Sequence, residues 1–183
     1  MVKKNNNRRV VVTGLGVVSS IGIGWEEFWK NLIAGKSGIK KITSFDVSKY
    51  DRQYAGEIRN FDFQKYNSTR KLTKMGRASQ LALVASKLAL KDAKLTTEQF
   101  KKAKVGICLG TTMGEPQVME KLDERCFPNK KYNIDFSSAF AYPASLISAN
   151  VALNLKSISH NIIFSNACAS GNYSIGYSYI FIF

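Results

Sequence analysis

Three short apolar runs, far apart in the chain, constrain the fold most. They are Val10–Val12, Val105–Leu109 and Ile162–Phe164, and the first two stop at Thr13-Gly14 and Gly110. Apolar, β-branched runs of this length are typical of buried strands. Because segments with helical periodicity lie between them, the strands should be joined by right-handed crossovers. The pattern predicts an α/β layered architecture.

The predicted helices occupy the long intervals between the strands. Trp25–Ala34 carries an apolar stripe opposite its charged residues and stops at Gly35, which indicates a helix that faces the core. Leu72–Leu90 has small residues at helical spacing and should approach another element closely. Two more helices are expected. Thr96 and Gln99 have the spacing of a capping box that opens a short helix. The other covers Ala139–Leu155, which has Pro143 near its first turn.

The remaining intervals show no sustained periodicity. Residues 36–70 are predicted to form a long irregular excursion with at most one short strand. The segment from Thr111 to Asn133 is predicted to be a polar, proline-containing stretch.

The composition limits the classes of partner. Among 183 residues, 27 lysines and arginines face 13 acidic residues, so the net charge of +14 predicts an acidic partner. Nucleic acid is not favoured, because no groove-reading motif accompanies the charge. No apolar run reaches the roughly 18 residues of a membrane span. Three widely spaced cysteines predict no disulfide framework, and we expect a cytoplasmic protein.

Gly14-Leu15-Gly16 follows the first predicted strand and allows two interpretations. A dinucleotide fingerprint would need a third glycine where Ser19 stands, and an acidic residue at the end of a second strand. The alternative is a turn whose glycines let a helix pack closely. We favour the turn, and with a single histidine in the chain we predict neither a cofactor nor a metal site.

Cys168 is the strongest candidate for chemistry. It lies between a predicted buried strand and a predicted helix, among Ala167, Ala169, Ser170 and Gly171, so little bulk shields the sulfur. The N–H groups of a helix start could stabilise a thiolate there and also form an oxyanion hole. The alternative is a buried structural cysteine.

The sequence gives the other candidate residues less support for a functional role. Cys108 lies inside an apolar strand and is interpreted as structural, and Cys126 in a charged loop as incidental. His160 precedes the third strand, so it should lie roughly 20 Å from Cys168 at about 3.3 Å per residue and is rejected as its partner. The basic residues Arg70, Lys71, Lys74 and Arg77 form either a solvated helix start or a docking patch for an acidic partner.

Several motifs, in order, resemble the β-ketoacyl-acyl-carrier-protein synthases, nearest the type II elongating condensing enzymes. They are Arg9–Ser19, Gly35–Ile39, Phe45-Asp46 and Asn166–Gly171, and the resemblance runs from about residue 8 to Tyr179. It implies a thiolase-like layered fold, here an incomplete N-terminal half with a mixed, mainly parallel sheet.

The resemblance also assigns roles to single residues. Cys168 matches the nucleophile that takes an acyl group from carrier-protein thioester, before decarboxylative Claisen condensation with malonyl carrier protein. Met113 matches a position that lines the acyl-chain pocket. Arg70 and Lys74 match bases that receive the acidic carrier protein, whereas Thr73 stands where the family often has a base. The resemblance also implies that the full-length enzyme is a homodimer and that it acts in fatty acid or polyketide biosynthesis.

The resemblance covers only the first part of a family member. We therefore expect a basic flexible N-terminus over 1–8, a truncated synthase N-terminal domain over 9–179 and an aberrant, β-prone apolar tail over 180–183. The family's two catalytic histidines and a lysine lie in its later half, so the chain alone should be inactive in condensation and should expose apolar surface. The alternative is a non-catalytic partner subunit that pairs with a complete synthase through Ile162–Ser165.

Overall fold

The computed structural model describes residues 9–67, 75–126, 142–157 and 159–182. Its α-helices are α1 (Trp25–Ile33), α2 (Arg77–Asp92), α3 (Thr97–Lys102), α4 (Pro116–Cys126), α6 (Ser145–Leu155) and α7 (Ser170–Phe181). Its strands are β1 (Val18–Ser19), β2 (Gly22–Ile23), β3 (Lys40–Lys41), β4 (Tyr54–Ala55), β5 (Ile107–Gly110) and β6 (Asn161–Phe164). Two 3₁₀ turns are η1 (Phe63–Tyr66) and η3 (Ala167–Ala169).

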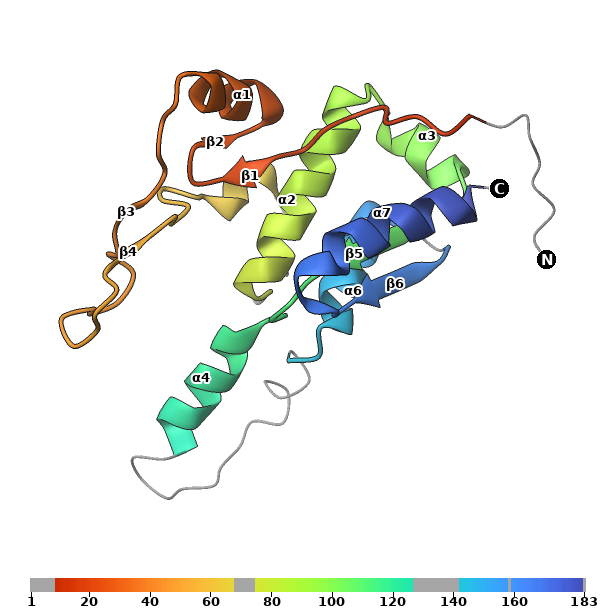
Figure 1. Cartoon of the computed structure of the whole chain (residues 1–183). Coiled ribbons are helices and arrows are strands. Elements are labelled where there is room, and N and C mark those ends of the chain that lie inside the picture. The colour runs from red at the N-terminus through yellow and green to blue at the C-terminus, as the bar shows by residue number, and fades with distance from the viewer. Residues whose placement is uncertain (1–8, 68–74, 127–141, 158, 183) are drawn as a thin grey trace.

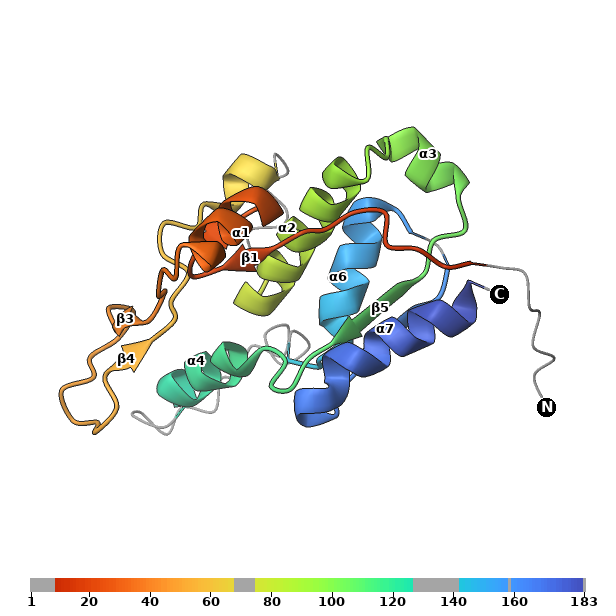
Figure 2. The same ribbon diagram turned by 45° about the horizontal axis from the view of Figure 1, so that its top comes forward.

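The centre of the molecule is the parallel pair β5–β6, which confirms two of the three predicted strands. Ile107 pairs with Asn161 and Gly110 with Phe164. Backbone hydrogen bonds from Ile107 N to His160 O (2.8 Å) and from Thr111 N to Phe164 O (2.9 Å) extend the ladder at both ends. Helices α6 and α7 contact the pair from opposite sides (Figures 1 and 2), which gives the helix-on-sheet layers expected of an α/β fold.

Helix α2 joins these layers to the N-terminal part of the chain. Its buried face packs on α6, and the core is formed by Phe63, Leu83, Val84, Ile107, Val151 and Ala152. The described strands also include two short antiparallel pairs, β1–β2 and β3–β4. Parallel and antiparallel pairing therefore both occur, in three separate two-stranded sheets of the described residues, and the longest ladder is parallel.

The prediction of a buried strand over Val10–Val12 is wrong in this structure. Val11 and Val12 lie in extended chain outside any described ladder, and Val12 is 81% exposed. A strand needs a neighbour that offers backbone hydrogen bonds. The segment instead crosses α2 (Figure 1), where Leu15 N donates to Asp92 Oδ2 (2.8 Å). A cavity of about 300 Å³ lies between Thr13-Gly14 and β5.

Gly14 and Gly16 pack directly on α2, as the close-packing interpretation predicts, although the backbone forms no turn at these residues. A Cβ atom at Gly14 would overlap the carbonyl oxygen of Ala89, and one at Gly16 would overlap that of Ala85. The small residues of α2 thus allow the predicted close approach, here to the backbone of Gly14–Gly16.

Replacing Gly16 with alanine is expected to destabilise the chain by about 1–3 kcal/mol, because the added methyl group must displace backbone. Gly176 of α7 is the matched control, since a Cβ there has no neighbour within 4 Å. Gly176→Ala should instead stabilise the helix by up to about 1 kcal/mol. Urea unfolding of the two variants measures the difference, and equal effects would contradict the packing argument.

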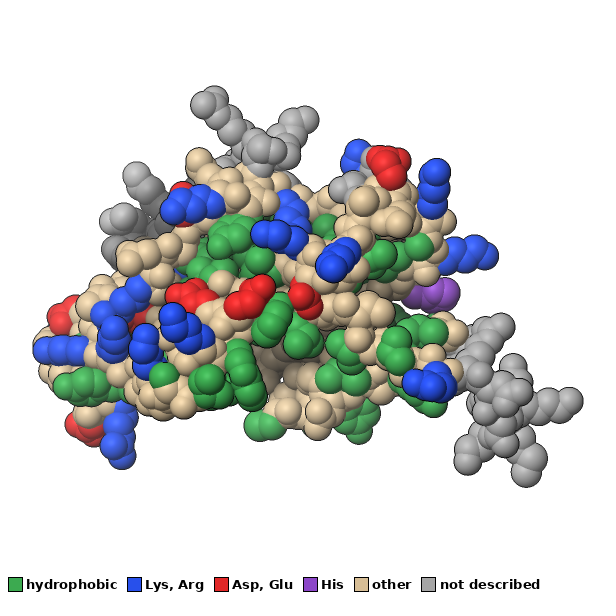
Figure 3. Space-filling model, turned by 90° about the horizontal axis from the view of Figure 1, so that it is seen from above, with side chains coloured by type: hydrophobic (Ala, Val, Ile, Leu, Met, Phe, Trp, Pro, Cys, Tyr) green, Lys and Arg blue, Asp and Glu red, His purple; other side chains and the backbone are tan. Residues whose placement is uncertain are grey.

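Helix α1 forms where it is predicted, but its orientation differs from the prediction. Trp29 is 56% exposed, and Leu32 and Ile33 are also exposed, so the apolar stripe does not face a core. No described element covers this stripe, and the helix mainly contacts β2. Figure 3 shows hydrophobic side chains open to solvent on the face seen from above. Exposed apolar surface was expected, although not on this helix.

Other element boundaries refine the predictions. The excursion over residues 36–70 contains two short strands instead of at most one, and the polar stretch after β5 contains helix α4. Thr96 and Gln99 form the predicted capping box of α3. Pro143 precedes α6 instead of lying in its first turn. The apolar residues Ile180 and Phe181 belong to α7, so this part of the expected β-prone tail is helical.

Candidate active site

Cys168 lies at the carboxyl end of β6, in the turn η3 that leads into α7. Its thiol is free and its side chain exposed, which favours the reactive over the buried interpretation. The turn begins with Ala167 in the left-handed region (φ 51°). The start of α7 then packs tightly against the end of β5, because a Cβ at Gly110 would overlap the backbone of Ser170. This packing holds the cysteine at the strand–helix junction.

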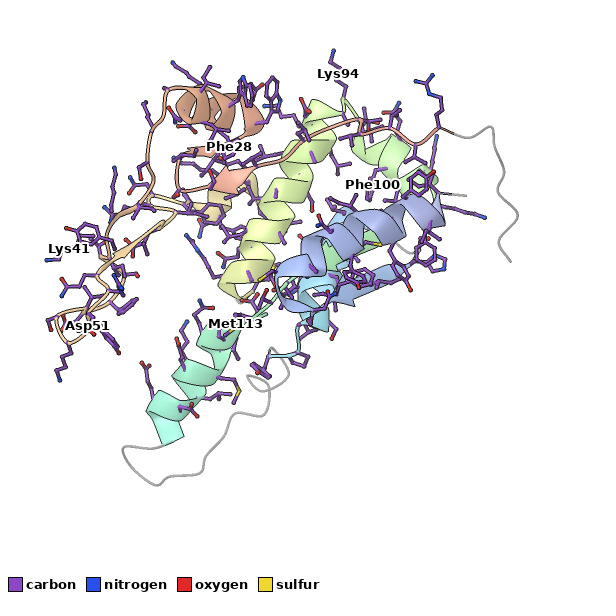
Figure 4. The ribbon with its side chains drawn as sticks, in the orientation of Figure 1. Phe28, Lys41, Asp51, Lys94, Phe100 and Met113 are labelled. Carbon is purple, nitrogen blue, oxygen red and sulfur yellow. The ribbon has the colours of Figure 1, made fainter. Side chains whose placement is uncertain are left out.

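Met113 lies in the loop after β5, at the same edge of the sheet as Cys168. The hydrogen bond from Thr111 N to Phe164 O ties the start of this loop to β6. Gly114 N donates to Thr111 Oγ1 (3.1 Å), and Gly114 has a φ of 69°, so the loop turns sharply just after Met113. Since β5 and β6 are parallel and in register, both residues follow carboxyl ends that meet at one edge. Figure 4 labels Met113 between β5 and α4.

Cys108 and His160 lie away from this edge. Cys108 is half-buried within β5 and lines the cavity between Thr13-Gly14 and β5. This position fits its interpretation as a structural cysteine. His160 lies at the amino end of β6, where its ring packs on Phe181 with the centroids 5.0 Å apart. His160 and Cys168 therefore lie at opposite ends of the strand, as the sequence predicts. Cys126 is the last residue of α4 instead of lying in a loop, and its side chain lies outside the described residues.

Of the four basic residues in the predicted docking patch, Arg77 alone lies within the described residues. Arg70, Lys71 and Lys74 lie outside the described residues, so the docking prediction stays a prediction. Arg77, at the start of α2, donates to Ile58 O (3.0 Å), and its guanidinium lies 4.6 Å from the centroid of the Phe61 ring. These contacts give Arg77 a structural role that neither interpretation of the basic cluster foresaw.

Glu115 is a notable residue that the sequence reasoning missed. It follows the Met113 loop and is only 2% exposed. Its Oε1 accepts from Ser79 N (2.7 Å) and its Oε2 from Ala78 N (3.0 Å), so it caps the first turn of α2 from a distant part of the chain. A glutamate next to Pro116 carries no local signal of burial, because its partners lie 36 and 37 positions away in sequence.

Glu57 organises the base of the β3–β4 excursion. Hydrogen bonds from Ser44 lower the pKa of Glu57 from its ordinary 4.5 to about 2. Thr43 N–H and the Arg59 guanidinium are further donors, the latter in a 3.0 Å ion pair. This carboxylate lines a hollow of about 690 Å³ that also contains Arg77 and Gln117.

The depressed pKa of Glu57 predicts an acid-dependent contribution to stability. The contribution is complete above the ordinary pKa and is lost as the pH falls from about 4.5 to about 2. Denaturant unfolding as a function of pH should show this loss in the wild-type chain. Glu57→Gln should remove that part of the acid dependence, and an identical acid profile in the variant would contradict the assignment.

The described residues contain no group of three histidine, cysteine or acidic side chains arranged to hold a metal ion. Within the same part of the chain, no helix is both long and apolar enough to cross a membrane.

The fold and the exposed cysteine at the strand–helix junction define the class of protein, and the comparisons with known proteins agree. The profile of the β-ketoacyl synthase N-terminal domain matches residues 7–180. The chain belongs to the β-ketoacyl synthase family, and its thiolase-like fold is that of the family.

Among the curated relatives that the chain matches are 3-oxoacyl-(acyl-carrier-protein) synthases. It is 32% identical to the 3-oxoacyl-(acyl-carrier-protein) synthase 2 of Synechocystis, over 92% of this chain and 41% of the relative. It is 36% identical to the chloroplastic synthase II of Arabidopsis thaliana, over 92% of this chain and 31% of the relative. The chain thus spans 31 to 41% of the length of these relatives.

Solved structures agree with the sequence relatives. A chain of the ishigamide ketosynthase/chain length factor superposes with a TM-score of 0.90 at 36% identity, over 96% of this chain and 44% of that one. A β-ketoacyl synthase from Burkholderia phymatum superposes with a TM-score of 0.77 at 28% identity, over 94% and 43%. A ketosynthase complex with a type II polyketide synthase acyl-carrier protein gives 0.74 at 26% identity, over 93% and 41%.

Proposed function

We propose that this chain carries the nucleophile of a β-ketoacyl-acyl-carrier-protein synthase, an acyltransferase that elongates acyl chains in fatty acid or polyketide biosynthesis. The observation that carries the proposal is the exposed, free thiol of Cys168 at the carboxyl end of β6. Active sites of open α/β sheets gather at this edge. The small residues around the thiol leave room for a thioester to approach.

The first step is the transfer of an acyl group between two sulfur atoms. The Cys168 thiolate attacks the thioester carbonyl, the carbon–sulfur bond to the carrier breaks, and the carrier leaves as a thiolate, which takes up the proton that the Cys168 thiol released. The oxyanion of the tetrahedral intermediate is to be stabilised by backbone N–H donors, among them that of Cys168. The product is an acyl-enzyme in which the chain passes Met113 at the same sheet edge.

The second step, decarboxylative condensation with a malonyl group, needs further acid–base groups. The 183 residues hold a single histidine, His160, and it lies at the far end of β6 from Cys168. We therefore infer that these residues alone accept an acyl group but do not complete the condensation.

The proposed partner is an acyl-carrier protein that carries acyl and malonyl groups. The net charge of +14 complements an acidic partner, and one similar structure is a ketosynthase in complex with its acyl-carrier protein. Arg70 and Lys74 are the proposed docking residues. We place the protein in the cytoplasm and expect a homodimer in the longer synthase.

A second candidate is a non-catalytic subunit that pairs with a complete synthase. One similar structure is described as a ketosynthase/chain length factor. In the described part of the chain, β6 pairs only with β5, so Ile162–Ser165 offers a free edge to a partner. The presence of Cys168 favours the catalytic candidate, because a subunit that only pairs has no use for an exposed nucleophile.

The two candidates differ in whether the chain takes up an acyl group. Incubation of the purified chain with acyl-carrier-protein thioester, followed by peptide mass spectrometry, should locate the acyl group on the peptide containing Cys168. The half-buried Cys108 is the internal control and should stay unmodified. Absence of acylation, together with co-purification of a complete synthase, would favour the partner-subunit candidate.

A further inference from the structure

The buried carboxylate of Glu115 connects the Met113 loop to α2, and the structure makes space for this contact. A Cβ atom at Gly76, the residue before α2, would overlap the Glu115 carboxyl group. Burying a carboxylate is costly unless its oxygens are hydrogen-bonded. Here each oxygen accepts a backbone N–H of α2, from Ala78 and Ser79, so the charge is compensated and its position is defined.

The loop that carries Met113 is therefore held at both ends. At its start, Thr111 N bonds to Phe164 O on β6, and at its end Glu115 bonds to α2. Met113 itself is 70% exposed, so its side chain has few contacts of its own to fix it. Its position relative to Cys168 depends on these two ties.

The tie to α2 is also anchored in the core. Ser79 is buried, and its hydroxyl accepts from Asn150 Nδ2 of α6 (3.1 Å). Helix α6 in turn packs against β5 and β6, the two strands that lead to Met113 and Cys168. Glu115 thus fixes the loop to the packed unit of α2, α6, β5 and β6, which also positions Cys168.

We propose that Glu115 is a positioning residue for acyl-chain selection, which holds Met113 at the mouth of the acyl-binding space beside Cys168. This inference rests on the proposed function, because chain selection has a meaning only if Cys168 accepts acyl groups. Release of the tie should let Met113 swing aside and relax discrimination against long chains.

The experiment compares acylation of Cys168 by the butanoyl, octanoyl and hexadecanoyl thioesters of N-acetylcysteamine. Glu115→Gln should raise the ratio of the second-order acylation rate constants for hexadecanoyl over butanoyl about tenfold, within the range that one pocket contact contributes. The rate at which iodoacetamide alkylates Cys168 should stay unchanged. Glu120→Gln, on the exposed surface of α4, is the control and should leave the ratio as in the wild type.

A double-mutant cycle separates positioning from a general loss of structure. If Glu115 acts through Met113, Glu115→Gln should change nothing further in a Met113→Ala background. Glu115→Asp, which keeps the charge but shortens the reach, gives a second test if Glu115→Gln fails to fold.

Two outcomes overturn the inference while the proposed function stands. One is an unchanged chain-length ratio in a folded Glu115 variant. The other is an equal fall for all thioesters and iodoacetamide, which indicates a purely structural role. Failure of the wild-type chain to take any acyl group overturns the proposed function itself, and the inference with it.

Discussion

Cys168→Ala is expected to abolish acyl uptake, lowering the rate at least about a thousandfold, because it removes the sulfur atom that is proposed to form the thioester intermediate. The wild-type chain should gain the mass of one acyl group from carrier-protein thioester, and the variant should gain none. The stability should change little, since the side chain is exposed. Intact-protein mass spectrometry with rapid quenching measures the rate.

Cys108→Ala is the matched control for this loss. Its sulfur is half-buried in β5, so the variant should lose some packing energy but keep the acylation rate. Persistent acylation of the Cys168→Ala chain would show that another nucleophile is responsible. It would remove the basis for the assigned function.

Leu83→Ala is expected to cause the largest loss of stability, about 3–5 kcal/mol. Leu83 is fully buried (0% exposed) where α2 meets the rest of the core, and its truncation leaves a cavity that the surrounding elements fill only in part. Urea denaturation followed by circular dichroism should show a lower midpoint with a similar slope.

Leu153→Ala makes the same chemical change on a helix surface. Leu153 of α6 is 76% exposed, so the expected change is within about 0.5 kcal/mol. Comparable losses in the two variants would mean that α2 does not pack as the structure shows.

Sequence reasoning succeeded where the determinants are local. The strands β5 and β6 follow from short apolar runs, and the capping box of α3 from Thr96 and Gln99. The place of Cys168, between strand and helix, follows from Asn166–Gly171 alone. The rejection of His160 as its partner needed only the length of an extended strand.

The failures occur where a residue's environment depends on distant chain segments. The run Val10–Val12 has the composition of a buried strand but no described ladder partner, and the stripe of α1 has no described element over it. The burial of Glu115 was invisible for the same reason, because Ala78 and Ser79 are its partners only after folding.

The amino-acid sequence by itself determined the family, the α/β pattern and the candidate nucleophile, because strand composition, helix caps and the motif around Cys168 depend on neighbouring residues. Only the tertiary structure decided that Met113 and Cys168 share one edge, that Gly16 lies on the backbone of α2, and that Glu115 is buried. Backbone pairing, close packing and charge burial are interactions between segments far apart in the chain, and they exist only once the chain is folded.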